Sequence, residues 1–590
     1  MNFTERINGL VAETLQHSLG CFGPELILSA AIVFLLLFRL CGLDRIVPTK
    51  FVALFSVLAA FVLACLQFMQ MKELPAIDDG LSQVFFSGLL VFDQFTVFFR
   101  VFLLLFLVLV ITLTVLSGIP DNEDGPDFYG LLIGSTIGMM LMASSNHLLM
   151  LFIGIEMTSV PSYAMVGFLK GRKLSSEAAL KYVVYGAGAA GVMLYGVSLL
   201  AGVLGTGDLP QLANNLQLLI GDQIQGGSIG ISNPVVRTVV FGILLVMVGL
   251  AFKLSIVPFH FWCPDAFEGA SAEVAGFLSV ASKAGAFALL VRFVLAFTAG
   301  DPGAMSGVYL SLGLGLGVVA ALSATFGNLA AYTQSNMKRM LAYSTIAHAG
   351  YMLMAVASLL VIQSAPDSVG LSSADVADKA GRCIEGLMYY LAVYLFMNLG
   401  AFAIIALIRN QIFSEELEDY NGLASQCPVL CICMLVCVFS LIGLPPFGGF
   451  FAKLMIFSSL FQAGSVHWMM WAILGVAGLN TAFSLFYYLR ILKAMFLTKR
   501  PEDARRVEES FGSPASSYVM MVSIPVLLLG MFPFVADGLS TTVNTVSTNL
   551  LNHTAKHQNR AKQNHLSLAV PVDNDELIET KPVTFLTKNQ

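Results

Sequence analysis

The chain has 590 residues, of which 57% are hydrophobic and only 12% are charged, and its formal net charge at pH 7 is −6. A soluble domain is usually about a quarter charged, so the composition excludes an ordinary soluble protein and predicts an all-α polytopic membrane protein. The small net charge gives no electrostatic case for binding nucleic acid.

Apolar windows of the length that crosses the hydrocarbon core predict about fourteen transmembrane helices. We expect them at residues 24–41, 50–69, 97–116, 128–144, 147–168, 178–203, 237–258, 272–298, 307–327, 341–362, 383–408, 428–445, 468–492 and 517–535. An even number of spans places both ends of the chain on the same side of the membrane.

The loops indicate which side that is. The segments LDRIVPTK, KGRK, SNMKRM and LKAMFLTKRPEDARR all fall on one side of the predicted topology and hold most of the basic loop residues. Because Lys and Arg are enriched in cytoplasmic loops, we expect both termini on the outer, periplasmic side.

Two of the predicted spans are interrupted by proline close to a lysine. The seventh ends within GLAFKLSIVPFHFW, with Lys253 and Pro258, and the twelfth ends within LIGLPPFGGFFAKLMIF, with Lys453 shortly after it. Broken helices at matching positions are typical of inverted-repeat transporters, in which unwound backbone helps to form an ion site. We therefore predict two inverted five-helix repeats with broken helices 7 and 12, and we expect unwound backbone beside Pro258 to stabilise the charge of Lys253.

The repeats divide the chain into five parts. We expect an N-terminal segment with three helices at 1–120, a first antiporter-like repeat (helices 4–8) at 121–299, and a second repeat (helices 9–13) at 300–495. A last helix follows at 496–545. The polar residues 546–590 lack helical apolar periodicity and are expected to form a flexible tail.

Five charged residues in or next to predicted spans are candidates for a functional role: Glu156, Lys181, Lys253, Lys283 and Lys453. Facing lipid at the bilayer centre, they would together cost roughly 12 to 17 kcal/mol, so we expect them to face the protein interior. Burial among apolar helices destabilises an ammonium relative to the neutral amine, and a nearby carboxylate opposes that effect. Such a Glu and Lys axis suits proton transfer, although static pairing or snorkelling to the interface would also explain the charges.

Three histidines in or beside the spans could have either a functional or a structural role. His348 lies within the tenth span and could relay protons between lysines, since imidazole gives and takes protons near neutral pH; packing between helices would explain it equally well. His260 follows Pro258 and is expected to cap carbonyls freed by the break, and His147 lies at the edge of a span.

Sequence signatures of cofactor or metal binding are weak or missing. The cysteines of CPVLCICMLVC lack metal-ligand spacing, and GAGAAG lies inside an apolar span without the βαβ unit that dinucleotide binding requires. We therefore expect no cofactor and no metal in this chain. Moving a proton against about 150 mV costs roughly 3.5 kcal/mol, so either a second ion gradient or a partner subunit must supply the energy.

Four stretches carry a resemblance to a known family: LFIGIEMTSVPSYAMVGFLKGRKLSSEAALKYVVYGA, GLAFKLSIVPFHFWCPDAFEGASAEVAGFLSVASKAGAF, GNLAAYTQSNMKRMLAYSTIAHAGYML and SLIGLPPFGGFFAKLMIF. They resemble the subunit N family of NADH-quinone oxidoreductase, respiratory complex I, from about Pro24 through the last span. The resemblance implies a fourteen-helix, antiporter-like subunit that supplies a proton path, within an enzyme that acts as a translocase.

The resemblance also implies roles for individual residues. Glu156 and Lys253 would form the charge pair of the first half-channel, Lys283 would be the central proton carrier, and Lys453 would belong to the broken helix of the second half-channel.

Two further residues match the family with less defined roles. Lys181 matches a lysine of the sixth helix, and His348 matches the histidine of the IAH stretch.

The same resemblance implies partners and a location. FMN, iron-sulfur clusters and quinone would be held by other subunits, and the chain would assemble with other membrane subunits rather than as an independent homo-oligomer. The expected location is an energy-transducing membrane, the bacterial inner membrane. A secondary cation/proton antiporter subunit shares these features, and a membrane scaffold with paired charges is the third alternative. Protonated lysine cannot ligate sodium, which favours protons as the transported ion.

Overall fold

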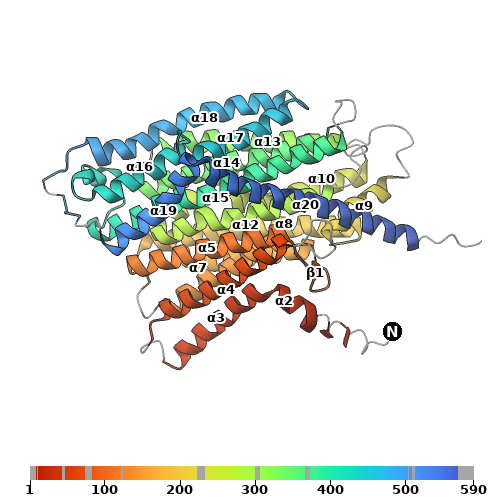
Figure 1. Ribbon diagram of the computed structural model, residues 1–590, viewed down its shortest axis with the longest axis horizontal. Coiled ribbons are helices and arrows are strands. Elements are labelled where there is room, and N and C mark those ends of the chain that lie inside the picture. The colour runs from red at the N-terminus through yellow and green to blue at the C-terminus, as the bar shows by residue number, and fades with distance from the viewer. Residues whose placement is uncertain are drawn as a thin grey trace, which may run out of the picture.

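The computed structural model describes residues 8–9, 11–12, 14–42, 47–73, 83–120, 124–221, 233–298, 306–365, 372–502, 504–507 and 512–568. Long helices that run nearly parallel to one another make up most of this part of the chain (Figure 1). The only sheet among the described residues is a small hairpin, β1 (Gln83–Phe85) and β2 (Leu90–Phe92), in which Gln83 lies opposite Phe92.

The helices follow the order expected from the apolar windows. The N-terminal part contains η1 (Thr14–Ser18), α2 (Leu19–Cys21), α3 (Gly23–Leu40), α4 (Thr49–Glu73) and α5 (Gln94–Ser117). The next part contains α6 (Gly125–Ser144), α7 (Leu148–Val166), α8 (Lys173–Leu204), α9 (Leu209–Gly221), α10 (Pro234–Leu254), α11 (Trp262–Gly269) and α12 (Ala272–Thr298).

The rest of the chain repeats this arrangement and then adds two helices. It contains α13 (Ser306–Ala331), α14 (Met337–Gln363), α15 (Ser373–Ile412), η5 (Leu417–Tyr420), η6 (Leu423–Ser425), α16 (Pro428–Ile442), α17 (Gly448–Gly464), α18 (Met469–Leu492) and η7 (Lys493–Leu497). The last helices are α19 (Pro514–Met531) and α20 (Pro533–Leu568).

The prediction of a polytopic membrane protein is confirmed. Thirteen of the described helices are long and apolar enough to cross a membrane, or up to fourteen if a bent pair that ends with α16 counts as one span. Most lie within about five residues of the predicted windows, but α15 begins at Ser373 rather than at the predicted residue 383. The breaks also lie where proline predicts them, between α10 and α11 and between α16 and α17.

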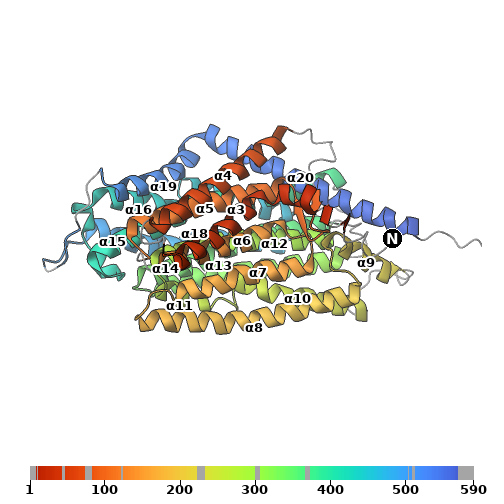
Figure 2. The same cartoon turned by 90° about the horizontal axis from the view of Figure 1, so that it is seen from below.

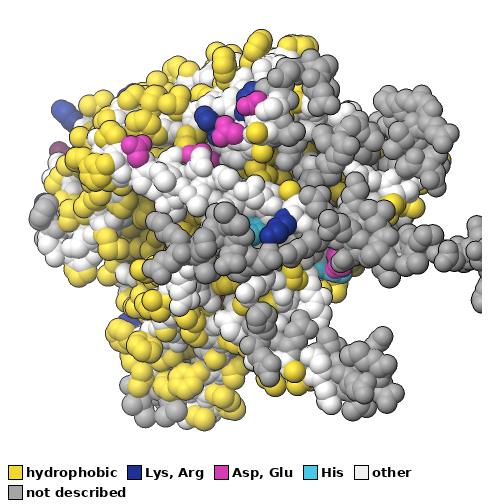
Figure 3. Space-filling model, turned by 45° about the vertical axis from the view of Figure 1, so that its right-hand side comes forward, with side chains coloured by type: hydrophobic (Ala, Val, Ile, Leu, Met, Phe, Trp, Pro, Cys, Tyr) yellow, Lys and Arg dark blue, Asp and Glu magenta, His cyan; other side chains and the backbone are white. Residues whose placement is uncertain are grey.

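The helices that carry the breaks surround a buried centre. Every residue of α12 is buried, and α14 is buried along almost its entire length. By contrast, α3, α4 and α8 have faces of exposed apolar side chains, such as Phe55, Val184 and Tyr195. Figures 1 and 2 show α3 and α8 at the edges of the bundle, and Figure 3 shows wide apolar areas with few charges. Such surfaces suit contact with lipid or with a partner subunit.

Two buried ion pairs connect α5 to its neighbours. Arg100 Nε lies 2.6 Å from Glu25 Oε1 on α3, and Arg292 Nη2 of α12 lies 2.7 Å from Asp93 Oδ1. Asp93 also caps α5, because its Oδ1 accepts from the Thr96 amide at 2.8 Å. If α3 or α12 moved away from α5, each pair would be broken and a buried charge would be left without its partner, which is costly. These ion pairs therefore hold the N-terminal helices against the centre.

The C-terminal region differs from the prediction. Residues 546–568, predicted as part of a polar tail, continue α20 as a helix. Val543, Val546 and Leu550 are buried, and Ser540 Oγ and Asn544 Nδ2 donate to the Glu385 carboxylate at 2.5 and 2.9 Å. Sparse apolar residues and side-chain hydrogen bonds therefore position a helix whose overall composition is polar. Residues 569–590 of the predicted tail lie outside the described residues.

Candidate functional site

The first break in a span exposes backbone carbonyl groups at the centre of the protein. Helix α10 ends at Leu254, and Ser255 adopts a left-handed conformation with φ of 58°. The last carbonyls of a helix have no partner within that helix. Lys283 of α12 occupies this position, because its Nζ donates to the Leu254 carbonyl at 2.8 Å and to the Thr345 carbonyl of α14 at 3.4 Å.

Lys253 lies in the last turn of α10, next to the same break, but has a different partner. Its Nζ donates to Ser159 Oγ of α7 at 3.2 Å, and the side chain is buried. Glu156, three residues before Ser159 on the same helix, acts on Lys253 electrostatically. Glu156 therefore acts on Lys253 through space, whereas the hydrogen bond of Lys253 goes to Ser159, and no ion pair between these two described side chains is formed by direct contact. The freed carbonyl that we expected Lys253 to use is bound by Lys283.

The second break repeats the arrangement of the first. Helix α16 ends at Ile442, and Gly443 is left-handed with φ of 86°. Lys453 of α17 donates through Nζ to the Ile442 carbonyl at 2.8 Å. A Cβ at Gly443 would lie 2.8 Å from Cδ of Lys453, so both the backbone conformation and the approach of the lysine require glycine here. The Lys453 ammonium also lies 4.8 Å from the centre of the Tyr351 ring.

Helix α14 connects the two lysines that face the breaks. Thr345, His348 and Tyr351 are spaced three residues apart, so they lie close to one face of this helix. Thr345 contacts Lys283, Tyr351 contacts Lys453, and His348 lies between them. Both lysines act electrostatically on the buried imidazole.

His348 has a hydroxyl on each side of its ring. Nδ1 lies 2.6 Å from the Tyr390 hydroxyl of α15, and Nε2 lies 3.3 Å from the Tyr488 hydroxyl of α18. The Tyr488 hydroxyl in turn bonds with Ser344 Oγ. Because a hydroxyl can donate or accept, either ring nitrogen can exchange a proton with a neighbour.

The other predicted site residues lie apart from this centre. Lys181 forms ion pairs with Glu177 at 2.9 Å and with Asp265 at 2.8 Å, and its side chain is 42% exposed. His260 packs against the ring of Phe326, with centroids 4.4 Å apart. His147 caps α7 by accepting from the Leu149 amide at 3.0 Å.

Residue-by-residue inspection of the sequence missed several polar neighbours. Ser159 and Thr345 look like ordinary small residues of an apolar helix, and no sequence signal sets them apart. Tyr390 and Tyr394 are detectable, because two tyrosines four residues apart share one face of an otherwise apolar span. The Tyr394 hydroxyl donates to Thr345 Oγ1 at 3.2 Å.

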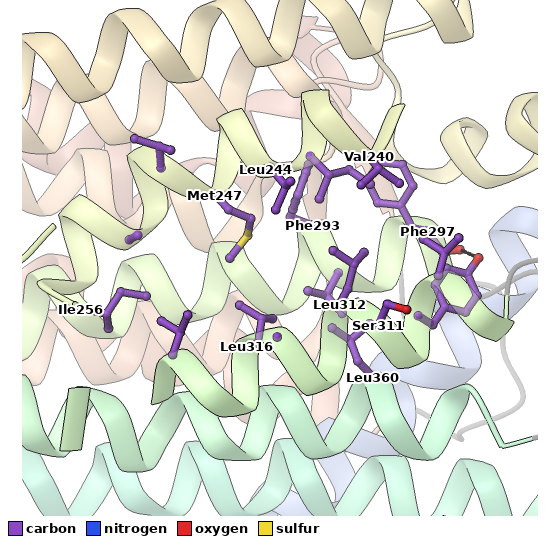
Figure 4. Close-up of a pocket in the computed structure, with 18 of the residues that line it drawn as sticks. Val240, Leu244, Met247, Ile256, Phe293, Phe297, Ser311, Leu312, Leu316 and Leu360 are labelled. Atoms are coloured by element: carbon purple, nitrogen blue, oxygen red, sulfur yellow. Dashed lines mark hydrogen bonds between the residues drawn. The ribbon is translucent and has the colours of Figure 1, made fainter. Parts of the chain in front are cut away.

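A large cavity beside the first break is apolar, unlike the polar surroundings of Lys283 and His348. It measures about 430 Å³ and lies between α10, α12 and α13. Figure 4 shows Met247, Phe293, Leu312 and Leu316 among the apolar side chains that line it. An apolar cavity offers few hydrogen-bond partners for water, so it does not continue the polar line of Lys283 and His348.

The site can hold and exchange protons, and it provides no cluster for metal binding among the described residues. No group of three or more His, Cys, Asp or Glu side chains is placed there to hold a metal ion. Lysine, imidazole and hydroxyl groups instead follow one another along α14, from one broken helix to the other. Together with the many spans, this line defines an antiporter-like membrane subunit.

The chain belongs to the NADH:quinone oxidoreductase/Mrp antiporter family, whose transmembrane family model matches residues 145–365 and 370–479. A protein of Chloroherpeton thalassium named NADH-quinone oxidoreductase subunit N 2 is 35% identical over 528 residues, which cover 88% of this chain and 93% of that protein. A protein of an Anaeromyxobacter species named NADH-quinone oxidoreductase subunit N is 37% identical over 500 residues, covering 83% and 89%.

Solved structures agree with this assignment. A chain of respiratory complex I from Thermus thermophilus with bound aureothin is 29% identical with a TM-score of 0.64, covering 86% of this chain and 97% of that one. A chain of the Mrp complex from a Dietzia species is 20% identical with a TM-score of 0.71, covering 92% and 99%. The second likeness shows the fold alone.

Proposed function

We propose that the chain is the proton-translocating membrane subunit N of an NADH-quinone oxidoreductase. The relatives named above support the assignment to that complex. The observation that carries the proton role is the position of Lys283, whose ammonium binds a freed carbonyl at one break and a carbonyl of α14, the helix that also carries His348 and contacts Lys453.

The charge pair of the first half-channel would control access to this line. Glu156 acts on Lys253 electrostatically, and Lys253 donates a hydrogen bond to Ser159. When the pair is close, the ammonium of Lys253 is stabilised; when Glu156 moves or gains a proton, that stabilisation is lost and Lys253 releases a proton. Movement of Glu156 on α7 would therefore change the protonation state of Lys253, the residue that precedes the Leu254 carbonyl bound by Lys283.

Proton movement between the half-channels would then use His348. Lys283 would pass a proton to the hydroxyl groups of α14 and α15. His348 would accept a proton at one ring nitrogen and release a proton from the other. The neutral amine of Lys453 would then accept the released proton. No electron moves in these steps. Redox chemistry, with FMN, iron-sulfur clusters and quinone, would take place in partner subunits.

Lys181 would have a place at the edge of this path. Its ion pairs with Glu177 and Asp265 lie near the start of α8, and its side chain is partly exposed. On the proposed topology, both termini are on the outer side of a bacterial inner membrane, and the Lys181 pairs lie near the inner side.

The test replaces Lys283 by Ala in the complete complex. Native gels first establish that the complex assembles, and NADH-driven proton pumping and NADH-quinone turnover are then measured in membrane vesicles. The proposal expects pumping and coupled turnover to fall by at least tenfold. Wild-type pumping would contradict it and favour a scaffold, and failure of any NADH-quinone oxidoreductase to co-purify would favour a secondary antiporter.

A further inference from the structure

A second group of charges lies at the beginning of α12, the helix that carries Lys283. Glu273 stands in the first turn of this helix and is 1% exposed. Its Oε2 atom is buried and has no hydrogen-bond partner among the described residues. A buried carboxylate oxygen without a partner is costly, so the position calls for a role beyond packing.

Lys338, in the first turn of α14, faces the same region. Its Nζ donates to the Ala270 carbonyl just before α12 at 2.5 Å and forms an ion pair with Glu415 Oε2 at 2.9 Å. Glu273 also acts electrostatically on this ammonium. One lysine therefore lies between two carboxylates, one bonded directly and one acting through space.

The other charged side chains near the cluster of Glu273, Lys338 and Glu415 form ion pairs. Arg409 Nε of α15 lies 3.6 Å from Glu415 Oε1. On α11, Asp265 and Glu268 both accept from Arg339 Nη1 at 2.6 Å. With all four groups ionised, Glu273, Lys338, Glu415 and Arg409 sum to zero charge, and one added proton leaves the cluster with a net positive charge.

The cluster extends from the surface into the protein. The side chain of Glu415 is 14% exposed and reaches the solvent boundary, while Lys338 and Glu273 are buried behind it. This end of the bundle is opposite to the end at which α9 and β1 lie (Figure 1), and it is the inner end on the proposed topology. Protons from that side therefore reach Glu415 before they reach Lys338 or Glu273.

Polar groups continue along α12 from Glu273 toward Lys283. The two residues are ten positions apart, or about 15 Å along the helix axis. Ser279 lies between them, one turn before Lys283, and its Oγ accepts from Asn398 Nδ2 of α15 at 2.6 Å. Asn398 is fully buried, and its Oδ1 has no hydrogen-bond partner among the described groups. Two unpartnered buried oxygens therefore mark this stretch at separate points.

We propose that Glu273, held beside Lys338, is the residue that loads protons from the inner side for Lys283. This inference rests on the proposed function of the chain. The Glu273 carboxylate accepts a proton from a hydronium ion, which leaves water, and the resulting carboxylic acid later returns the proton through water and the Ser279 and Asn398 groups to the neutral amine of Lys283. No bond other than those to the proton changes.

The test compares four forms of the complete complex in inside-out membrane vesicles, whose medium bathes the inner side. Glu273→Gln removes the carboxylate and keeps the shape of the side chain, and Glu273→Asp keeps the carboxylate. Glu385→Gln is the matched control, because Glu385 is also buried on a span but bonds to Ser540 and Asn544 on α20. Lys283→Ala reports on the proposed function itself. NADH-driven acidification and coupled turnover are measured from pH 6 to pH 9, after native gels for assembly.

We expect Glu273→Gln to lower vesicle acidification at least fivefold and to flatten the dependence of acidification on pH. Glu273→Asp should recover much of the loss. Glu385→Gln should keep the wild-type pH profile. Wild-type pumping by Glu273→Gln, with pumping lost in Lys283→Ala, would overturn the inference alone. Equal loss of assembly in Glu273→Gln and Glu273→Asp would assign Glu273 to structure and also overturn it. Wild-type pumping by Lys283→Ala would overturn the proposed function.

Discussion

Lys283 donates a hydrogen bond to the carbonyl oxygen of Leu254 at 2.8 Å, so a buried ammonium on one helix closes the broken end of another. Lys453 makes the equivalent contact with Ile442 at the second break. In each case a left-handed residue follows the carbonyl, and the helix cannot continue past it. Loss of the proton from either lysine would leave that carbonyl with a weaker partner, which couples protonation to the shape of the broken helix.

Ser159 is predicted to be required for coupled turnover, because it accepts the hydrogen bond of the Lys253 ammonium. Ser159→Ala removes the acceptor for Lys253, and a hydrogen bond to a charged group contributes about 1.5–3 kcal/mol. We expect coupled NADH-quinone turnover to fall about tenfold at neutral pH, because neutral Lys253 becomes more populated. The control is Ser162→Ala, since Ser162 is buried on the same helix and donates to the Thr158 carbonyl. Equal turnover in the two variants would contradict the role of Ser159.

His348 is predicted to be required as a base rather than as a packing residue. His348→Phe keeps an aromatic ring and removes both nitrogens, and proton transfer by a positioned side chain contributes about 10²–10⁴-fold to a rate. We expect pumping to fall by at least tenfold, and Tyr390→Phe to cause a smaller loss, because the Tyr488 hydroxyl remains.

The matched control for these variants is Tyr389→Phe. Tyr389 is buried next to Tyr390, but its hydroxyl has no hydrogen-bond partner among the described residues. Vesicle acidification is compared at equal amounts of assembled complex. A loss in Tyr389→Phe as large as that in Tyr390→Phe would show that packing, and not proton exchange, explains the result.

Asp93 is predicted to stabilise the fold at neutral pH. Burial alone would raise the pKa of this carboxyl, but the Arg292 guanidinium and the Thr96 groups hold the pKa below its ordinary value. A depressed folded-state pKa adds stability above the unfolded value of about 4, and that stability is lost as the pH falls through the folded value. Asp93→Asn should therefore destabilise the protein by about 3–5 kcal/mol at pH 7, because Arg292 is left unpaired.

Thermal unfolding of the purified complex at a fixed heating rate measures this effect. Asp378→Asn is the control, because its ion pair with Arg382 is largely exposed and a surface pair contributes only about 0–1 kcal/mol. If Asp93→Asn and Asp378→Asn unfold at the same temperature as the wild type at pH 7, the buried pair does not hold α5 against α12.

The spans could be predicted from sequence because the membrane imposes a length and a composition on each helix. The breaks were predictable for the same reason, since proline and glycine interrupt an apolar window near Pro258 and Gly443. The polar helix α20 was not, because its few buried contacts, such as Leu550, depend on surfaces that α5, α9 and α15 supply.

The site was predictable only in part. Lys253, Lys283 and Lys453 are visible as charges in apolar windows, and the cost of burying them marks them for function. Their partners are main-chain carbonyls and hydroxyls from helices distant in sequence, such as Leu254 for Lys283. Arg100, Arg292 and Lys338 are also buried within spans, and no role was predicted for them. Which charge meets which acceptor is decided by tertiary packing, not by spacing along the chain.

The central claim is that Lys283 must lose and regain a proton in each cycle, and the replacement Lys283→Arg tests it most directly. Arginine keeps a positive charge and hydrogen-bond donors beside the Leu254 carbonyl but cannot be deprotonated in a protein. The measurement is the number of protons moved per NADH oxidised by the assembled complex, with the exposed residue Lys170 replaced by Arg as the control. The account predicts a lower proton ratio for Lys283→Arg and an unchanged ratio for Lys170→Arg. A wild-type ratio in Lys283→Arg would contradict it and make Lys283 a static charge.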